Sequence, residues 1–192
     1  MQCKRTAVAR DAGFTTRAED GNLYIEGYFA VYNSRYDLWD GAYETIAPGA
    51  FDGETNGDVR ALTNHDTTLV LGRTTAGTLT LRTDDRGLWG SITINQNDSD
   101  AMNTYERVKR GDVSQCSFGF DILDQDVQYT DGEPTVWTIR KVKLYEVSVV
   151  TFPAYTDTSV EARRKDLTDI QKRKSDEWKR QASEKLKTIM SH

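Results

Sequence analysis

Short segments in which apolar and other residues alternate dominate the chain as far as Pro153. Residues 23–32 (LYIEGYFAVY) alternate with period two, which is typical of a half-buried strand, and Asn33-Ser34 then supplies turn residues. Similar patterns predict strands at 59–63, 78–83, 88–95, 116–123, 136–139 and 143–151. Several short strands separated by turn signals favour a β-barrel or sandwich over a doubly wound parallel sheet.

One helix is predicted inside this β-rich region. Asp98 or Ser99 can serve as its N-cap, and Gly111 follows basic residues where a helix would end. Apolar residues recur every three positions between these signals: Met102, Tyr105 and Val108. We expect this helix to pack one face on the strands.

The pattern changes after Pro153. From about residue 161, a charged segment carries a narrow apolar stripe at helical spacing: Leu167, Ile170, Trp178, Ala182, Leu186 and Ile189. This predicts a long helix that is exposed or bound to a partner. The expected organisation is an N-terminal segment at 1–20, a central domain at 21–160 and a charged helical tail at 161–192, so the fold class is mainly β with helices, α+β.

Charge and composition exclude several classes of function. The chain of 192 residues has a formal net charge of −5, which gives no general reason to expect nucleic-acid binding, although the tail is basic. It contains no apolar run long enough to span a membrane, and the charged first twenty residues do not resemble a secretory signal. Cys3 and Cys116 lack the paired spacing of a zinc site, so we expect two free thiols and no metal.

His65 is the first candidate for chemistry, because the chain's second histidine is the terminal His192. An imidazole is the side chain best suited to proton transfer near neutral pH, and His65 lies at the predicted end of a strand. The alternative is a histidine with a structural role only.

Ser117 lies on a predicted strand between large aromatic residues and beside Gly119. A buried serine needs a partner, which is either a functional group or simply a backbone carbonyl. Ser114 and Cys116 are rival nucleophiles nearby, but alternation along a strand places Cys116 on the opposite face from Ser117.

Glu146 interrupts an apolar strand in which Tyr145, Val147 and Val149 face one way and Glu146, Ser148 and Val150 the other. Burying an unpaired carboxylate costs on the order of several kcal/mol, so Glu146 either pairs with a group such as an imidazole or lies on a solvated strand face.

A series of short blocks in a fixed order resembles the prohead protease family of tailed bacteriophages. The blocks are 27–33 (GYFAVYN), 44–51 (ETIAPGAF), 64–66 (NHD), 71–74 (LGRT), 77–79 (GTL), 110–113 (RGDV), 117–120 (SFGF), 146–150 (EVSVV) and 153–155 (PAY). The resemblance covers about residues 22–163, most of the chain.

This resemblance implies a fold similar to the herpesvirus maturation protease assemblin, a β-barrel flanked by helices. It further implies His65 as general base, Ser117 as nucleophile and Glu146 as the group that orients the imidazole. The herpesvirus enzymes use a second histidine as the third residue and place arginines after it. Here Glu146 and Pro153-Ala154-Tyr155 occupy these places, so the oxyanion donors stay unassigned.

The implied function is that of a serine endopeptidase that matures proheads without a cofactor. Its implied partners are the major capsid protein with its scaffolding segment, or a separate scaffold protein, and further copies of itself. Its implied place is the host bacterial cytoplasm, inside the assembling prohead, with no role for nucleic acid or membrane.

Two alternatives compete with this interpretation. The first is an inactive protein of the same fold that serves as a structural part of the prohead. The second is a metal hydrolase that uses His65 and Asp66, although no H-x-x-x-H or H-E-x-x-H spacing supports it.

Overall fold

The computed structural model describes residues 5–9, 13–152 and 157–190. The chain divides into two compact units, residues 1–155 and 156–192. The first unit contains the strands and the helix α1, whereas the second is formed by the helix α2 (Asp157–Met190). Neither α1 nor α2 is long and apolar enough to cross a membrane.

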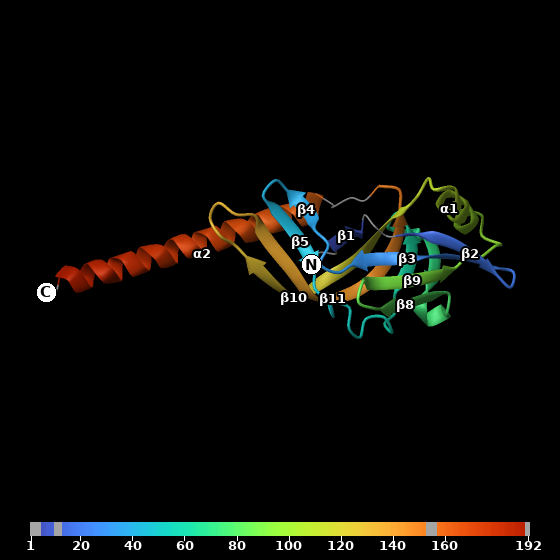
Figure 1. Ribbon diagram of the computed structural model, residues 1–192, viewed down its shortest axis with the longest axis horizontal. Helices are drawn as coiled ribbons and strands as arrows, with labels where there is room; N and C mark the ends of the chain where they lie inside the picture. Colours follow the sequence, from blue (N-terminus) through green and yellow to red (C-terminus); the bar gives the residue numbers. More distant parts are fainter. Residues whose placement is uncertain (1–4, 10–12, 153–156, 191–192) are drawn as a thin grey trace. The chain divides into compact units, whose positions relative to one another are not determined.

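The strands of the described residues form two sheets (Figure 1). In the first, the order is β1 (Arg5–Ala9), β10 (Gln115–Gln128), β11 (Thr135–Val150), β5 (Ala42–Ile46) and β4 (Tyr36–Trp39), and β6 (Arg60–Thr63) and β7 (Asp66–Arg73) branch from β11. In the second, the order is β2 (Thr15–Glu19), β3 (Asn22–Val31), β9 (Gly87–Thr93) and β8 (Leu79–Thr83). The long strand β11 pairs in parallel with β5 along its first part and with β6 along its last part.

The core combines side chains from both sheets. Cys116, Phe118 and Phe120 of β10 lie in one buried cluster with residues of β3, β8 and β9. The Phe118 ring packs against those of Phe120 and Phe51, with centroids 4.8 and 5.4 Å apart. Burying a large apolar side chain contributes about 1.5–3 kcal/mol, so these residues fix which face of β10 points inward.

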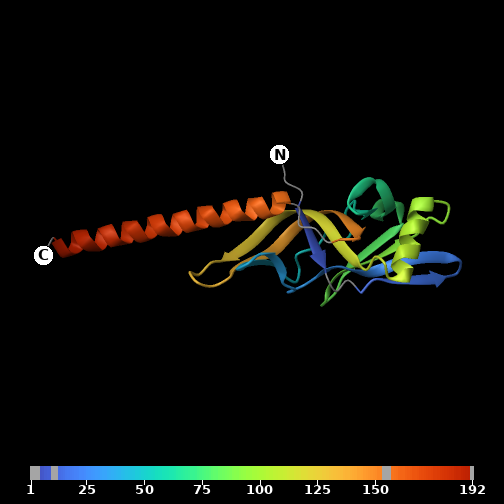
Figure 2. The same ribbon diagram turned by 90° about the horizontal axis from the view of Figure 1, so that it is seen from above.

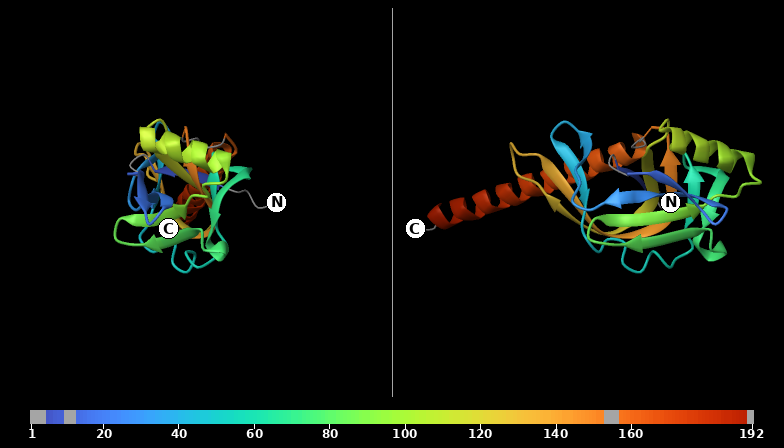
Figure 3. Two further views of the ribbon diagram at one scale, coloured as in Figure 1. Left: turned by 90° about the vertical axis from the view of Figure 1, so that its right-hand side faces the viewer. Right: turned by 45° about the vertical axis from the view of Figure 1, so that its right-hand side comes forward.

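The helix α1 (Ser99–Arg110) confirms its prediction. The Asp98 carboxylate accepts the backbone N–H groups of Asp100 and Ala101, and Gly111 ends the helix with a φ of 86°. The helix lies across the strands, in contact with β2 and β3 of one sheet and β7 of the other (Figures 2 and 3). Its Thr104 hydroxyl lies 3.1 Å from that of Thr63, at the end of β6.

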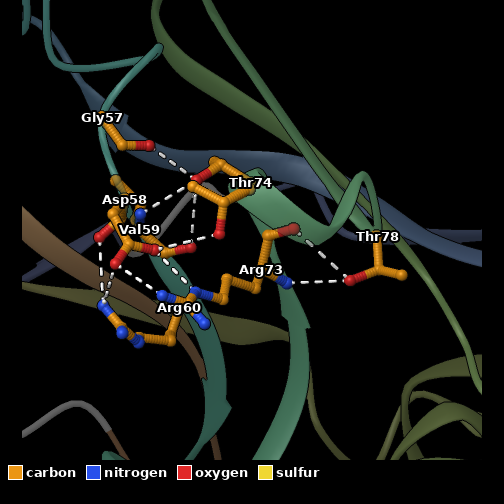
Figure 4. Close-up of polar contacts among 8 residues, drawn as sticks. Gly57, Asp58, Val59, Arg60, Arg73, Thr74 and Thr78 are labelled. Atoms are coloured by element: carbon orange, nitrogen blue, oxygen red, sulfur yellow. Dashed lines mark hydrogen bonds and ion pairs between the residues drawn. The ribbon is translucent and has the colours of Figure 1, made fainter.

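A second set of contacts holds β7 to the segment that precedes β6 (Figure 4). Arg73 donates two hydrogen bonds to the Asp58 carboxylate, at 2.6 and 2.7 Å. The Thr74 hydroxyl accepts the backbone N–H of Val59 at 2.9 Å and donates to the Gly57 carbonyl at 2.6 Å. These bonds hold the two strands of the β6–β7 hairpin together at its open end, opposite the turn.

Most predicted strands are present, and two predictions need comment. The strands expected at 23–32, 59–63, 78–83, 88–95 and 116–123 correspond to β3, β6, β8, β9 and β10. The segments expected at 136–139 and 143–151 are also strand, but the break predicted between them was wrong, because both belong to the continuous β11. Arg140 and Lys141 are both exposed and interrupt the alternation, while β10 accommodates them with an irregular register between Ile122 and Gln125.

The predicted α+β class and the C-terminal helix are confirmed, although α2 begins at Asp157 rather than near residue 161. The predicted barrel is not confirmed. Within the described residues the two ladders of strands share no member, and they stand as two sheets.

Candidate active site

The register of β10 against β11 places the candidate residues on one face of the sheet. Ser117 lies directly opposite Ser148, and Gly119 lies opposite Glu146. Opposed residues of an antiparallel pair point to the same side, and so do residues two apart on one strand. Cys116 points the other way, as predicted: its thiol is buried, and Sγ lies 3.0 Å from the Tyr28 carbonyl oxygen.

Glu146 is buried, with only 6% of its side-chain surface exposed, so the alternative of a solvated glutamate is wrong. A bulge at Tyr145 adjusts its direction, since the register passes from Gly119 opposite Glu146 to Phe120 opposite Leu144. A Cβ atom at position 119 would lie 2.3 Å from Glu146 Oε1. The carboxylate therefore occupies space that only a glycine at position 119 leaves open.

His65 lies in the two-residue turn between β6 and β7. Asn64 and His65 have φ angles of 51° and 62°, the pair of positive values that a type I′ hairpin turn requires. The strand β7 was not predicted. The sequence therefore indicated that His65 lies at the end of a strand, but not that it lies in the turn of a hairpin. A non-glycine residue with positive φ costs on the order of 1 kcal/mol, so the surrounding contacts must hold the turn.

Contacts with β11 hold the turn in place. The Asn64 backbone N–H donates to the Val149 carbonyl at 2.9 Å, and the Thr151 N–H donates to the Asn64 side-chain oxygen at 2.9 Å. The contact between Thr63 and Thr104 of α1 adds support from the other side. Together these bonds fix the position of the turn relative to β11, and therefore the position of the His65 imidazole.

The imidazole of His65 and the carboxylate of Glu146 meet, with Nδ1 and Oε1 2.7 Å apart. The imidazole is the more open partner, with 29% of the His65 side-chain surface exposed. With its Nδ1–H donated to the carboxylate, a neutral imidazole keeps Nε2 as its acceptor, and can take a proton from a hydroxyl there.

Ser148 is a member of this cluster that the sequence analysis did not single out. Its hydroxyl donates to Glu146 Oε2 at 2.6 Å and lies 3.3 Å from the His65 backbone nitrogen, whose N–H it accepts. The signal available in the sequence was alternation, which puts Ser148 on the same face as Glu146. Alternation alone does not distinguish such a residue from any other small residue in the strand.

Ser117 has no exposed surface and lies directly across the ladder from Ser148. Opposed Cβ atoms of an antiparallel pair are about 4.5–5.5 Å apart, so Ser117 is the neighbour of the imidazole–carboxylate cluster on the adjacent strand. Its rival Ser114 is exposed and precedes β10.

Asp66, the metal ligand in the metal-hydrolase alternative, bonds to Thr68 within its own strand β7. Its Oδ1 accepts the Thr68 hydroxyl at 2.6 Å and the Thr68 N–H at 2.8 Å, and these bonds lower the pKa of Asp66. No group of three or more His, Cys, Asp or Glu side chains in the described part of the chain is placed to hold a metal ion.

Comparison with known proteins adds the family. No curated protein and no solved structure matches the chain. The profile of one family, described as caudovirus prohead serine protease, matches residues 12–173. That range covers most of the chain and includes β10, β11 and the turn that carries His65. The chain therefore belongs to the caudovirus prohead serine protease family.

Proposed function

We propose that this capsid maturation protease cuts peptide bonds with Ser117 as nucleophile, His65 as general base and Glu146 as the group that orients the imidazole. The observation that carries the proposal is the 2.7 Å contact between His65 Nδ1 and Glu146 Oε1. It joins residues 81 positions apart in the sequence, on the face of the sheet that also bears Ser117.

In the proposed reaction, His65 Nε2 takes the proton of the Ser117 hydroxyl while Ser117 Oγ forms a bond to the substrate's carbonyl carbon. The imidazolium then gives that proton to the leaving amine as the peptide C–N bond breaks. Water then attacks the acyl carbonyl carbon while His65 Nε2 takes a proton from it, and the imidazolium returns that proton to Ser117 Oγ as the acyl–oxygen bond breaks. Glu146 keeps the proton on Nδ1 and stabilises the charged imidazolium.

The proposed substrates are the scaffolding segment of the capsid protein or a separate scaffold protein, and the protease itself. Because Ser117 is fully buried, a substrate reaches it only after the groups that cover it move, so we expect slow turnover. Confinement inside a prohead in the host cytoplasm raises the concentration of cleavage sites around each enzyme, and a slow enzyme then suffices.

The second candidate is an inactive component of the prohead. The complete burial of Ser117 favours it, since an idle serine needs no path to solvent. The buried Glu146 argues against an inactive protein. Burying a carboxylate beside an imidazole costs free energy, and the pair is useful for proton transfer, whereas an apolar side chain would pack at lower cost.

The first test compares cleavage by purified variants. Ser117→Ala and His65→Ala should each lower the cleavage of capsid protein and of the chain itself by about 10⁴-fold or more, as removal of a nucleophile or base does in other serine proteases. Glu146→Gln should lower cleavage by a smaller factor. The substitution removes the negative charge beside the imidazole but leaves an amide oxygen that can accept the Nδ1–H, and His65 remains as the base. Cleavage is measured by mass spectrometry of the products.

Ser114→Ala serves as the control, since it removes an exposed serine three positions from Ser117 and should cleave at the wild-type rate. Circular dichroism checks that each variant is folded. Wild-type cleavage by folded Ser117→Ala would refute the nucleophile, and wild-type cleavage by Glu146→Gln would remove Glu146 from the site.

A further inference from the structure

We propose that Ser148 is a positioning residue that locks the carboxylate of Glu146 and the turn of His65 into one unit, an inference that rests on the proposed function. Ser148 has no exposed surface. Its hydroxyl makes two contacts, 2.6 Å to Glu146 Oε2 and 3.3 Å to the His65 backbone nitrogen.

The two contacts fix the direction of the hydroxyl. A carboxylate oxygen only accepts and a backbone N–H only donates, so the single proton of Ser148 points to Glu146 and a lone pair faces His65. Together with the contact of Nδ1 to Oε1, they close a ring that passes through the His65 backbone, Ser148, the Glu146 carboxylate and the imidazole.

This ring assigns each oxygen of Glu146 a different partner: Oε1 faces the imidazole and Oε2 faces Ser148. Rotation of the carboxylate would break both bonds at once. The two bonds therefore resist rotation and hold the imidazole in the tautomer with its proton on Nδ1. Without the hydroxyl, Oε2 loses a donor in a buried place, and the carboxylate is free to turn.

The same geometry argues against Ser148 as the nucleophile. Its proton is directed to the Glu146 carboxylate, and its contact with His65 is to the backbone nitrogen rather than to an imidazole nitrogen that could take the proton. Ser117, across the ladder, keeps that role.

The test uses the full chain and a fluorophosphonate probe, which reports activation of the nucleophile without a peptide substrate. Ser148→Ala should lower the limiting rate of inactivation by about tenfold to a hundredfold, the effect of losing one hydrogen bond to a charged group. The probe concentration at half-maximal rate should stay unchanged, because Ser148 contacts Glu146 and His65 rather than the probe.

The matched control is Ser91→Ala. The Ser91 hydroxyl also donates to a glutamate, Glu26 Oε1 at 2.8 Å, but in the other sheet. Its loss removes the same kind of bond, but in the sheet that does not carry His65 and Glu146. The inactivation rate should therefore stay at the wild-type value. A lower rate in both variants would mean that general loosening of the fold explains the effect, and would overturn the proposal.

A second pair of variants covers the case in which Ser148→Ala does not fold. Threonine and valine have the same shape, so Ser148→Thr and Ser148→Val differ only in the hydroxyl at this position. We expect the threonine variant to react at close to the wild-type rate and the valine variant to react as slowly as alanine. Equal rates for the two would overturn the proposal.

Nuclear magnetic resonance of ¹⁵N-labelled histidine supplies a direct readout. The chain has two histidines, so a His192→Gln background leaves His65 alone in the spectrum. We expect the proton on Nδ1 in the wild type and a mixture of tautomers in Ser148→Ala. An unchanged tautomer together with an unchanged rate would overturn the role of Ser148.

The outcomes separate this inference from the proposed function. Failure of the Ser148 variants to change the rate leaves the roles of Ser117, His65 and Glu146 untouched. Wild-type labelling of Ser117→Ala would sink the proposed function whatever Ser148 does. Labelling that disappears in Ser148→Ala and persists in Ser117→Ala would make Ser148 the nucleophile and refute both.

Discussion

Gly119 determines where the Glu146 carboxylate can lie, although it carries no functional group itself. It lies on β10 opposite Glu146, and a Cβ there would meet Oε1 at 2.3 Å and the side-chain carbons Cγ and Cδ at 3.0 Å. These atoms belong to the far part of a flexible side chain, which yields more easily than backbone. A larger residue at position 119 would therefore displace the carboxylate from His65.

Gly119→Ala should lower the cleavage rate about as much as Glu146→Gln does, because both remove the carboxylate from its place beside the imidazole. Gly90→Ala is the contrasting variant, since its Cβ would lie 2.7 Å from the Phe29 ring and 2.9 Å from a Leu81 methyl group, both in the core. It should cost stability on the order of 1–3 kcal/mol by overpacking and spare the chemistry of the folded fraction.

Thermal unfolding and cleavage measured on the same samples separate the two effects. Full activity in folded Gly119→Ala would show that Glu146 does not need this space.

Sequence alone identified the residues whose chemistry is unusual for their position. His65 is the only internal histidine, and Glu146 is a carboxylate in an apolar strand, so each stood out without a structure. Ser148 and Gly119 did not, since their importance comes from what lies opposite them. That information depends on the register between β10 and β11, which includes a bulge at Tyr145 that no local pattern announces.

The hairpin of β6 and β7 is the element that delivers the imidazole to β11. It is tied at its turn by bonds to Val149 and Thr151 and at its open end by the contact between Arg73 and Asp58. The Arg73 guanidinium lowers the pKa of Asp58 to about 2. The charged pair therefore strengthens the hairpin only while Asp58 is ionised.

The pH dependence of stability tests this element. Because the pKa of Asp58 is lower in the folded state than its ordinary value, its contribution is present above about pH 4 and fades as the pH falls through about 2. Asp58→Asn should be less stable than the wild type at neutral pH, and the difference should shrink below pH 4. The effect should be modest, because both side chains are exposed and screened by solvent.

Urea unfolding at a series of pH values measures it, with Asp85→Asn as a control at another exposed aspartate. A difference between Asp58→Asn and wild type that stays constant from pH 7 to pH 2 would rule out the ion pair as its cause.

Elements with clear alternation or capping could be predicted, and those without could not. The cap at Asp98 and the glycine at 111 defined α1 to within a residue. The strand β7 begins with Asp66-Thr67-Thr68, a polar run that matches a loop better than a strand, and it forms because β6 offers a partner. The short strand β5 likewise depends on pairing with β11, far along the chain, and β4 in turn pairs with β5.

At the scale of the whole molecule, the three proposed catalytic residues lie in the first compact unit, residues 1–155. Ser117 and Glu146 come from the neighbouring strands β10 and β11, and His65 comes from the β6–β7 turn, 81 positions from Glu146, so the site exists only when the seven-stranded sheet is assembled. The second unit, α2, carries the basic residues of the tail and an exposed Trp178.

Peptide mapping of the chain after inactivation by a fluorophosphonate locates the activated hydroxyl, because the modified peptide gains the mass of the probe. We expect one adduct, on Ser117, which accumulates in proportion to the loss of cleavage and does not form in His65→Ala. An adduct on Ser114, Cys116 or Ser148 that tracks the loss of cleavage, with Ser117 unmodified, would refute Ser117 as the nucleophile.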